Sequence, residues 1–195
     1  VLREVEVIAS EDTRRTRKLL AHHRIGTRPV SLHRFNEDKA SGWIVEQLEA
    51  GRNVAYVTDA GTPAVSDPGA RLVSHVRAAG HPVLPLPGPC AAVTALSASG
   101  WEGPFVFEGY PSRKGRQRTS QLARLARESR AVILYEAPTR IRRTLEDLAR
   151  VVPAHRILLA REMTKIHEQY LQNTASRLLE DLPEPVKGEI TLVIM

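Results

Sequence analysis

The chain has 195 residues, 42% of them hydrophobic and 26% charged, which is the composition of a globular protein able to bury a core of its own. No run of about 18 uninterrupted apolar residues occurs, which excludes a membrane-spanning helix, and the first residues lack the charged-then-apolar plan of a signal peptide. A single cysteine, Cys90, excludes an internal disulfide and a cysteine-based zinc site, so we expect a cytoplasmic protein in a reducing environment.

The formal net charge of +6 and the isoelectric point near 9.9 favour an anionic partner. Arginine supplies most of the positive charge, and its guanidinium binds phosphate in a bidentate manner that lysine cannot offer. The basic residues cluster in three segments: Arg14, Arg15, Arg17 and Lys18; Arg113, Lys114, Arg116 and Arg118; and Arg140, Arg142 and Arg143. Charge alone leaves two interpretations open, a surface for nucleic acid and an ordinary solvated basic surface.

Strands and helices are expected to alternate along the chain. Strands are predicted at 4–9, 29–32, 54–57, 82–86, 105–108, 131–135, 157–160, 170–171 and 189–194, and helices at 11–22, 37–50, 67–80, 91–99, 117–128, 136–150 and 174–182. This alternation is typical of an α/β fold, with mixed strand direction in the second half. The pattern pauses at 100–104, so we expect two α/β domains, residues 1–100 and 101–195.

The most informative stretch is the strand at 54–57 with the loop at 58–69, which is rich in glycine, proline and aspartate. A second strand and turn of this kind follow at 82–92. Because open α/β sheets bind ligands at the carboxyl ends of parallel strands, the two loops together indicate a shared ligand crevice. Neither dinucleotide-binding nor P-loop glycine motifs are present, and mostly small, neutral loop residues suit an uncharged or zwitterionic ligand. Such loops also occur in α/β proteins that bind nothing there.

Seven short sequence motifs in the chain resemble those of a known family. They occupy residues 8–14, 57–63, 66–69, 85–92, 135–140, 160–165 and 187–192. In this order they resemble the bacterial small-subunit ribosomal RNA cytidine 2′-O-ribose methyltransferases, which are members of the tetrapyrrole methylase superfamily. The resemblance implies two α/β domains that hold S-adenosylmethionine in the cleft between them, usually as a homodimer. It also implies methyl transfer to a ribose hydroxyl of ribosomal RNA, either free or in the small ribosomal subunit.

The chain departs from this family at its beginning. Members normally start with a strand and a Pro-x-Gly-Asn turn upstream of the segment where this chain begins, and nothing in the chain corresponds to them. We therefore expect the N-terminal strand of the first sheet to be missing.

The resemblance also implies which residues lie beside the cofactor. They are Thr62, Pro63 and Val65 in the first loop, Cys90 and Ala91 in the second turn, and Glu136, Glu189 and Ile190 in the second domain. Cys90 is expected to be a packing residue, since direct methyl transfer needs no covalent enzyme step. No metal is expected, because the seven histidines show no ligand spacing.

A ribose hydroxyl is a poor nucleophile, so a general base would assist the reaction. The candidate catalytic residues are Asp59, Glu11 and Lys165, the last only if its pKa is depressed. Asp59 is preferred because it follows directly on the end of a strand. Turn formation and helix capping are the competing roles for Asp59 and Glu11.

RNA binding is assigned to two of the basic segments. The residues are Arg14, Arg15 and Arg17 near the first helix and Arg113, Lys114, Arg116 and Arg118 in a later loop. Two other functions remain open. One is methylation of a tetrapyrrole carbon by the same cofactor, which the arginine-rich segments disfavour. The other is a non-catalytic RNA-binding module for ribosome assembly.

Overall fold

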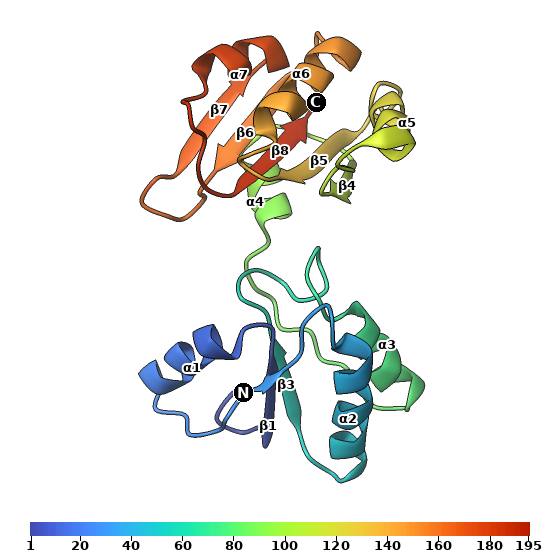
Figure 1. Ribbon diagram of the computed structural model, residues 1–195, viewed down its shortest axis with the longest axis vertical. Coiled ribbons are helices and arrows are strands. Elements are labelled where there is room, and N and C mark those ends of the chain that lie inside the picture. The colour runs from blue at the N-terminus through green and yellow to red at the C-terminus, as the bar shows by residue number, and fades with distance from the viewer. The chain divides into compact units, whose positions relative to one another are not determined.

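The computed structural model describes all 195 residues, and the chain divides into two compact units, Val1–Pro89 and Cys90–Met195 (Figure 1). This division lies ahead of the expected boundary at residue 100. The reason is helix α4 (Ala91–Ser97), whose buried Ala92 and Ala95 pack against Ile133 and Val193 of the second unit's sheet. The helix therefore belongs to the second unit, and the pause at 100–104 falls inside that unit.

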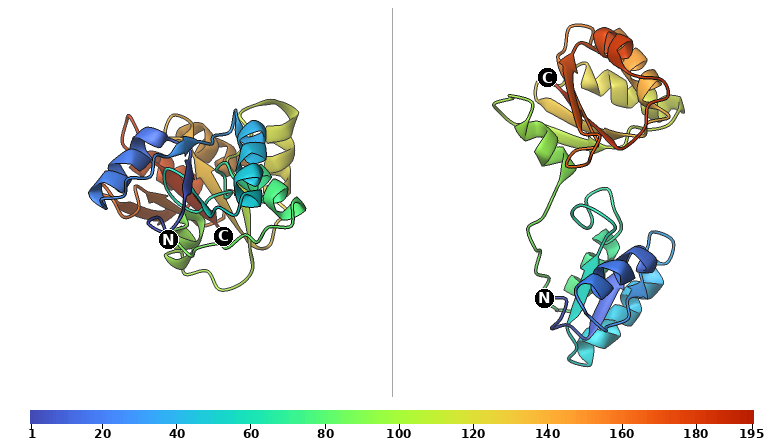
Figure 2. Two further views of the ribbon diagram at one scale, coloured as in Figure 1. Left: turned by 90° about the horizontal axis from the view of Figure 1, so that it is seen from below. Right: turned by 90° about the vertical axis from the view of Figure 1, so that its left-hand side faces the viewer.

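The first unit is a small parallel sheet with helices on both faces. Its elements are β1 (Val7–Ser10), α1 (Thr13–His22), β2 (Val30–Ser31), α2 (Glu37–Glu49), β3 (Val54–Val57) and α3 (Ala70–Ala78). The strand order is β2-β1-β3, and both pairings are parallel. Figures 1 and 2 show α1 on one face of this sheet and α2 with α3 on the other. The central strand β1 is buried along its whole length, as expected of a strand covered on both faces.

One expected strand of the first unit does not form. Residues 82–86 have no regular structure, and Leu84 and Leu86 are 83% and 63% exposed. A strand is stable only when its backbone groups pair with a neighbour, and prolines at 82 and 85 bring no N–H to such a ladder. The prediction of a strand at 82–86 is therefore wrong for this structure, and β3 pairs on one side only.

The second unit is a five-stranded mixed sheet. Its remaining elements are β4 (Phe105–Gly109), α5 (Gly115–Leu125), β5 (Ala131–Glu136), α6 (Ile141–Val151), β6 (Ile157–Arg161), β7 (Gln169–Asn173), α7 (Ala175–Asp181) and β8 (Ile190–Ile194). The strand order is β4-β5-β8-β6-β7. Only β4 and β5 pair in parallel, and the other pairs are antiparallel, which confirms the expected mixture of directions.

Alternate residues of these strands fill two separate cores. On one face, Val132, Leu134 and Leu192 pack with residues of α5, α6 and α7, while on the other face Ile133 and Val193 pack with α4. Figure 2 shows the same division, with α4 on one side of the sheet and α5, α6 and α7 on the opposite side. A strand buried on both faces reads as a continuous apolar run, and this is why β5 and β8 were recognisable in the sequence.

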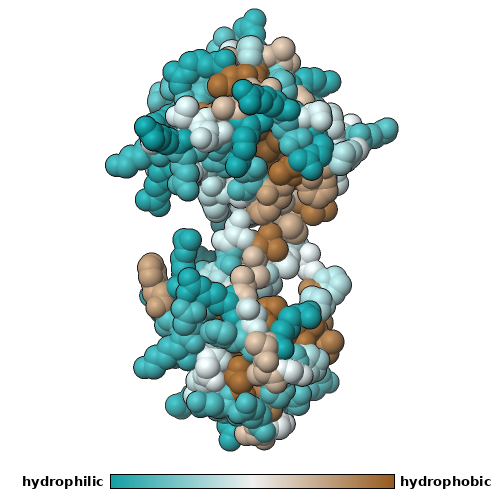
Figure 3. All heavy atoms as spheres, turned by 90° about the vertical axis from the view of Figure 1, so that its right-hand side faces the viewer, coloured by the Kyte–Doolittle hydropathy of each residue, from teal (hydrophilic) through white to brown (hydrophobic).

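The surface of the second unit is mostly hydrophilic in the space-filling view. On the face drawn in Figure 3, hydrophobic residues lie at the end of this unit where the chain enters it and in a smaller patch at the opposite end. No helix in either unit is long and apolar enough to cross a membrane.

Candidate functional site

The carboxyl edge of the first sheet brings two of the predicted catalytic carboxylates together. Because Ser10 pairs with Val57 in parallel register, the residues that follow β1 and β3 leave the sheet at the same edge. The backbone N–H of Asp59 donates to Glu11 Oε2 at 3.3 Å, and Arg15 lies 3.5 Å from Asp59 Oδ2. Glu11 thus positions the backbone at Asp59, while the Asp59 side chain remains partly exposed.

The loop after β3 has an unusually constrained backbone. Ala64 and Ser66 adopt positive φ angles of 67° and 64°, a conformation that costs free energy for residues with a side chain and is frequent at ligand sites. The loop is tied down by a 3.2 Å hydrogen bond from the Tyr56 hydroxyl to Pro68 O. At Gly69, with φ of 127°, a Cβ atom would lie 2.8 Å from the Tyr56 ring, so only glycine fits there.

A buried carboxylate that the sequence analysis missed also holds this loop. Glu37 Oε1 accepts hydrogen bonds from the backbone N–H groups of Gly69 and Arg71 at 2.9 Å and of Leu72 at 3.4 Å. These are the unpaired donors at the start of α3, so Glu37 caps that helix from a different helix. No local sequence pattern connects residues 32 to 35 positions apart, so nothing in the sequence could have revealed the contact.

The predicted cofactor residues of the first unit lie in the turn of this loop. Thr62 Oγ1 donates to Pro89 O at 3.1 Å, which ties the turn to the end of the unit. The backbone N–H groups of Gly61 and Thr62 donate to no group of the protein. Pro63 and Val65 are half-buried beside them. The turn is uncharged and offers free backbone donors, as a polar ligand would require.

In the second unit, the turn at Cys90 and Ala91 leads into α4 and lies against Tyr135. The Tyr135 hydroxyl accepts a 3.1 Å hydrogen bond from Ala92 N, and burial raises the pKa of Tyr135 to about 12. The Tyr135 ring also packs edge-on against Phe107 at 4.9 Å. Cys90 is partly buried against this cluster, as expected of a packing residue. The sequence analysis did not single out Tyr135, although it lies within one of the matching motifs.

Three separate sequence motifs meet at one end of the second sheet. Ile190, the first residue of β8, pairs with Glu136 on one side and with Arg161 on the other. Beyond this row, Glu162 N donates to Glu189 O at 3.0 Å and Glu189 N donates to Glu162 Oε1 at 2.8 Å. The structure therefore brings the predicted residues Glu136, Glu189 and Ile190 together.

Lys165 belongs to the same end of the sheet but cannot be the predicted base. Its ammonium donates to Glu189 Oε2 at 2.8 Å and to Glu162 Oε1 at 2.9 Å. These two carboxylates raise the pKa of Lys165 above its ordinary value. The condition attached to its catalytic role, a depressed pKa, is contradicted, and Lys165 stays protonated near neutral pH.

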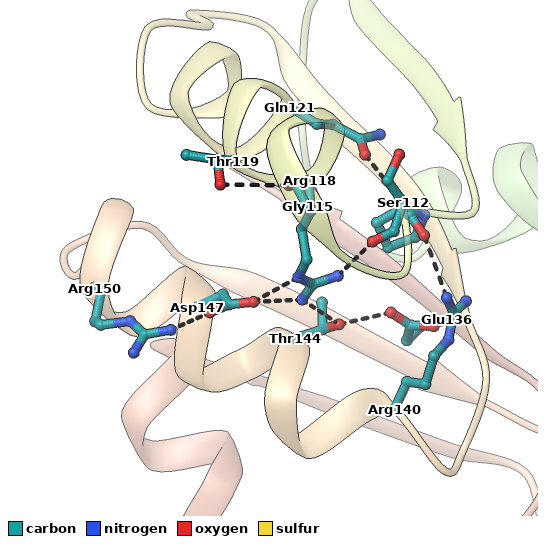
Figure 4. A network of polar contacts seen from close by, with 11 residues as sticks. Ser112, Gly115, Arg118, Thr119, Gln121, Glu136, Arg140, Thr144, Asp147 and Arg150 are labelled. Atoms are coloured by element: carbon teal, nitrogen blue, oxygen red, sulfur yellow. Dashed lines mark hydrogen bonds and ion pairs between the residues drawn. The ribbon is translucent and has the colours of Figure 1, made fainter.

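The side chain of Glu136 is not free for a cofactor either. It is buried, with Oε2 accepting from Thr144 Oγ1 at 2.6 Å and Oε1 accepting from Ala137 N and Arg140 at 2.8 and 2.6 Å. Figure 4 shows this carboxylate among the polar side chains of α6 and the preceding turn. Any cofactor contact at this position would have to come from the backbone, because the carboxylate serves the fold.

Arg118, predicted to bind RNA, is a structural residue. It is 5% exposed, and its guanidinium donates to Asp147 Oδ2 at 2.7 Å, to Thr144 Oγ1 at 3.1 Å and to Ser112 O at 3.0 Å. Figure 4 shows how Arg118 of α5 connects this helix to α6 and to the loop that follows β4. A polyanion cannot reach this guanidinium, so the prediction for Arg118 is wrong.

The other predicted RNA-binding residues are exposed. Arg113 and Lys114 in the loop after β4, and Arg116 in the first turn of α5, have no partner within the protein. The base of the loop is held by bonds from Arg118 to Ser112 O and from Arg140 to Pro111 O. Near α1, Arg14 pairs with Asp12 and Arg15 with Asp59, whereas Arg17 is unpaired. The structure contains no group of three or more metal-ligating side chains.

Comparison with known proteins identifies the family. A model of the tetrapyrrole (corrin/porphyrin) methylases matches residues 1–179. The chain belongs to this family. It is a methyltransferase, and it is 44% identical over its whole length to the ribosomal RNA small subunit methyltransferase I of Vibrio cholerae, of which it covers 69%. The enzymes of that name from Haemophilus influenzae and Bacillus subtilis are 45% and 40% identical over 98% and 99% of the chain, with 69% and 67% of their own length covered.

Solved structures of this family share the fold. A cobalt precorrin-4 methyltransferase of cobalamin biosynthesis superposes with a TM-score of 0.69 at 15% identity, over 99% of this chain and 84% of that one. A uroporphyrin-III C-methyltransferase from Thermus thermophilus, in complex with S-adenosylhomocysteine, superposes with a TM-score of 0.61 at 16% identity, over 98% and 86%. The expected tetrapyrrole methylase fold is confirmed.

Removing the Glu37 cap is expected to loosen the loop after β3. Glu37→Ala leaves three buried or half-buried N–H groups without an acceptor, which costs about 1–3 kcal/mol. Glu37→Gln keeps an acceptor oxygen and should retain most of the stability. Urea unfolding gives the free energies, and hydrogen exchange at residues 69–72 reports the local effect. Equal exchange rates in Glu37→Ala and the unchanged protein would contradict this role.

The buried ion pair of Arg118 and Asp147 is expected to contribute far more to the stability of the fold than an exposed ion pair does. Asp147→Ala leaves the buried guanidinium without its partner and should lower the free energy of unfolding by about 3–5 kcal/mol. The matched control is Glu180→Ala, which removes the exposed partner of Arg177 and should cost less than about 1 kcal/mol. Similar losses in the two variants, measured by urea unfolding, would show that the Asp147 pair is not a structural support.

The Glu162 carboxylate is expected to make the stability of the fold decrease as the pH falls. The hydrogen bond from Glu189 N, followed by that from Lys165, holds the pKa of Glu162 below its ordinary value of 4.5. A depressed pKa stabilises the fold above pH 4.5, and this contribution is lost as the pH falls through the folded-state value. Between pH 6 and pH 3 the temperature of thermal unfolding should therefore fall less steeply with decreasing pH in Glu162→Gln than in the unchanged protein. Parallel curves for the two proteins would contradict the assignment.

Proposed function

We propose that this chain transfers the methyl group of S-adenosylmethionine to the ribose 2′-hydroxyl of a cytidine in small-subunit ribosomal RNA, in the cytoplasm and as a homodimer. The observation that carries the proposal is identity of 40–45%, over nearly the whole chain, with enzymes named ribosomal RNA small subunit methyltransferase I. The weaker likeness to corrin and porphyrin methylases, at 15–16% identity, concerns the fold alone.

The residues present suit the cofactor. When bound, S-adenosylmethionine supplies an electrophilic methyl group, which a hydroxyl oxygen attacks in line. A zwitterionic amino-acid end and an uncharged adenosine require polar backbone groups rather than a cluster of cations. The turn at Gly61 and Thr62, with its unpaired N–H groups and neutral side chains, meets that requirement. We assign Thr62, Pro63, Val65, Cys90, Ala91 and the backbone of Glu136, Glu189 and Ile190 to cofactor binding.

Asp59 is the proposed acceptor of the hydroxyl proton. It stands at the carboxyl edge of the first sheet, its backbone is held by Glu11, and Arg15 orients one of its carboxylate oxygens. Glu11 is a positioning residue in this proposal. Lys165 takes no part in proton transfer, because it is held protonated by Glu162 and Glu189.

The proposal is tested by the identity of the methylated product. Small ribosomal subunits lacking the modification are incubated with the protein and labelled S-adenosylmethionine, and their RNA is digested to nucleosides. We expect 2′-O-methylcytidine by mass spectrometry and no label on a porphyrin precursor. Label on the porphyrin, or on a cytosine carbon, would overturn the proposal. If calorimetry detects no binding of S-adenosylmethionine, the result would favour a non-catalytic RNA-binding module instead. Light scattering measures the oligomeric state.

Replacing the proposed base should slow chemistry without affecting cofactor binding. Asp59→Asn is expected to lower kcat about 10²–10⁴-fold, the usual contribution of general base catalysis. The matched control is Asp38→Asn, an exposed carboxylate on α2 that pairs with Arg71. Unchanged kcat in Asp59→Asn would exclude this residue as the base.

The exposed basic residues of the loop after β4 and of the first turn of α5 are expected to contribute to RNA affinity by charge. Neutralising Arg113, Lys114 and Arg116 to glutamine should reduce the slope of log affinity against log salt by about 2, since each single-stranded phosphate contact contributes about 0.7. A charge-matched control replaces Arg77, Arg127 and Arg156, which are exposed elsewhere. Equal slopes for the two triple variants in fluorescence anisotropy would contradict a specific role of Arg113, Lys114 and Arg116.

A further inference from the structure

One segment of the first unit accounts for the net positive charge of the whole chain. Residues 13–36 contain no aspartate or glutamate, and they contain seven basic residues: Arg14, Arg15, Arg17, Lys18, Arg24, Arg28 and Arg34. The remainder of the chain has 21 basic and 22 acidic residues and is nearly neutral. The excess charge is therefore concentrated on α1 and the segment that leads from it to β2.

This same segment encloses a groove of about 440 Å³. One wall is the face of α1 formed by Arg17, Leu20 and Ala21, which are spaced three and four residues apart, and the other is the segment 25–29. The volume lies within the range of about 300–1,000 Å³ that small-molecule sites occupy.

The groove exists because the helix ends in a left-handed turn. Arg24 has a φ of 54°, and Ile25 N donates to Leu20 O at 2.9 Å, which turns the chain back along the helix. The last carbonyl groups of α1 are paired as well: His23 N donates to Leu19 O, and Arg3 donates to His23 O at 2.8 Å. The negative end of the helix is thus largely satisfied, which reduces its repulsion of an anion nearby.

The chemistry of the walls is that of a nucleotide site. Arg17 and Arg28 are exposed and have no ion pair or hydrogen-bond partner within the protein. Between them the lining residues Leu20, Ile25 and Pro29 are apolar, and of these Ile25 remains partly exposed. Guanidinium groups bind phosphate in bidentate fashion, and an apolar surface accepts the face of a base or ribose. Gly26 has open space where a Cβ would be and an unstrained φ, so the groove has room at its rim.

We propose that this groove binds a single-stranded segment of the RNA substrate, with one phosphate at Arg17, another at Arg28, and a base or ribose against the apolar lining between them at Ile25. The proposal rests on the proposed function, because it names the substrate that enters the groove. It adds a contact that is distinct from the basic residues Arg113, Lys114 and Arg116. An acidic protein segment would also meet the two arginines, but it would make no use of the apolar lining between them.

The first test adds bulk at the rim of the groove without changing the charge. Gly26→Leu projects a side chain into the open space, and Gly42→Leu is the matched control, since Gly42 is exposed on α2 with equally open space. The probe is a fluorescein-labelled single-stranded RNA of about 12 nucleotides, a length that covers one to a few ordinary single-strand sites. We expect Gly26→Leu to weaken binding about fivefold or more, the equivalent of one lost base-stacking contact, and Gly42→Leu to bind as the unchanged protein does.

A second variant tests the charges. Arg17→Gln combined with Arg28→Gln should reduce the slope of log affinity against log salt by about 1.4, the contribution of two single-stranded phosphates. Thermal unfolding shows whether each variant is folded. If Gly26→Leu and the double variant bind the RNA as Gly42→Leu does, the proposal is overturned. It is also overturned if they lose affinity for a polyglutamate peptide and not for RNA.

The outcome is separable from that of the proposed function. Methyl transfer by the unchanged protein to small subunits, together with unaltered RNA binding by the groove variants, would reject the groove and leave the function standing. Weaker RNA binding by the groove variants, with no methyl transfer by the unchanged protein, would support the groove and reject the function.

Discussion

The position of β8 is the constraint on which the second unit depends. This last strand of the chain lies in the middle of the five-stranded sheet, buried along its length and paired with β5 and β6 at once. Alternate residues point to the two cores, so a slip of one residue would move every β8 side chain into the other core and disrupt the packing of both. The same pairing puts Ile190 between Glu136 and Arg161, and therefore assembles the end of the sheet from three distant parts of the sequence.

A network of buried charges connects that sheet end to the surface loop beside it. Glu136 bonds to Thr144, Thr144 to Arg118, and Arg118 to Ser112 O at the base of the basic loop. Figure 4 follows this path from β5 through α6 to α5. Each buried group in it has a partner, as a charge in a low-dielectric interior requires. The arrangement holds the loop carrying Arg113 and Lys114 by its base while leaving its side chains free.

The arginines fall into two classes, those that donate to groups of the fold and those that have no partner within the protein and are free to bind a ligand. Arg118, Arg140 and Arg142 donate to groups of the fold, while Arg17, Arg28 and the tip of the basic loop donate to none. Sequence position does not distinguish these classes, since the exposed Arg116 lies only two residues from the buried Arg118. On a helix, positions two apart face different directions, and only the one facing α6 meets Asp147.

The sequence by itself determined the family, the places of nearly all helices and strands, and the mixed direction of the second sheet. It did so because these depend on local apolar patterns and on motifs of a few residues. It also placed Asp59 and Glu11 correctly after their strands, since the chain order alone puts both at one edge of a parallel sheet. Only the tertiary structure decided the rest. The segment 82–86 lacks a neighbouring strand, Lys165 lies between two carboxylates, and Glu37 and Asp147 reach partners about 30 residues away. Pairing, burial and charge compensation across such distances are properties of the folded chain, and no window of the sequence contains them.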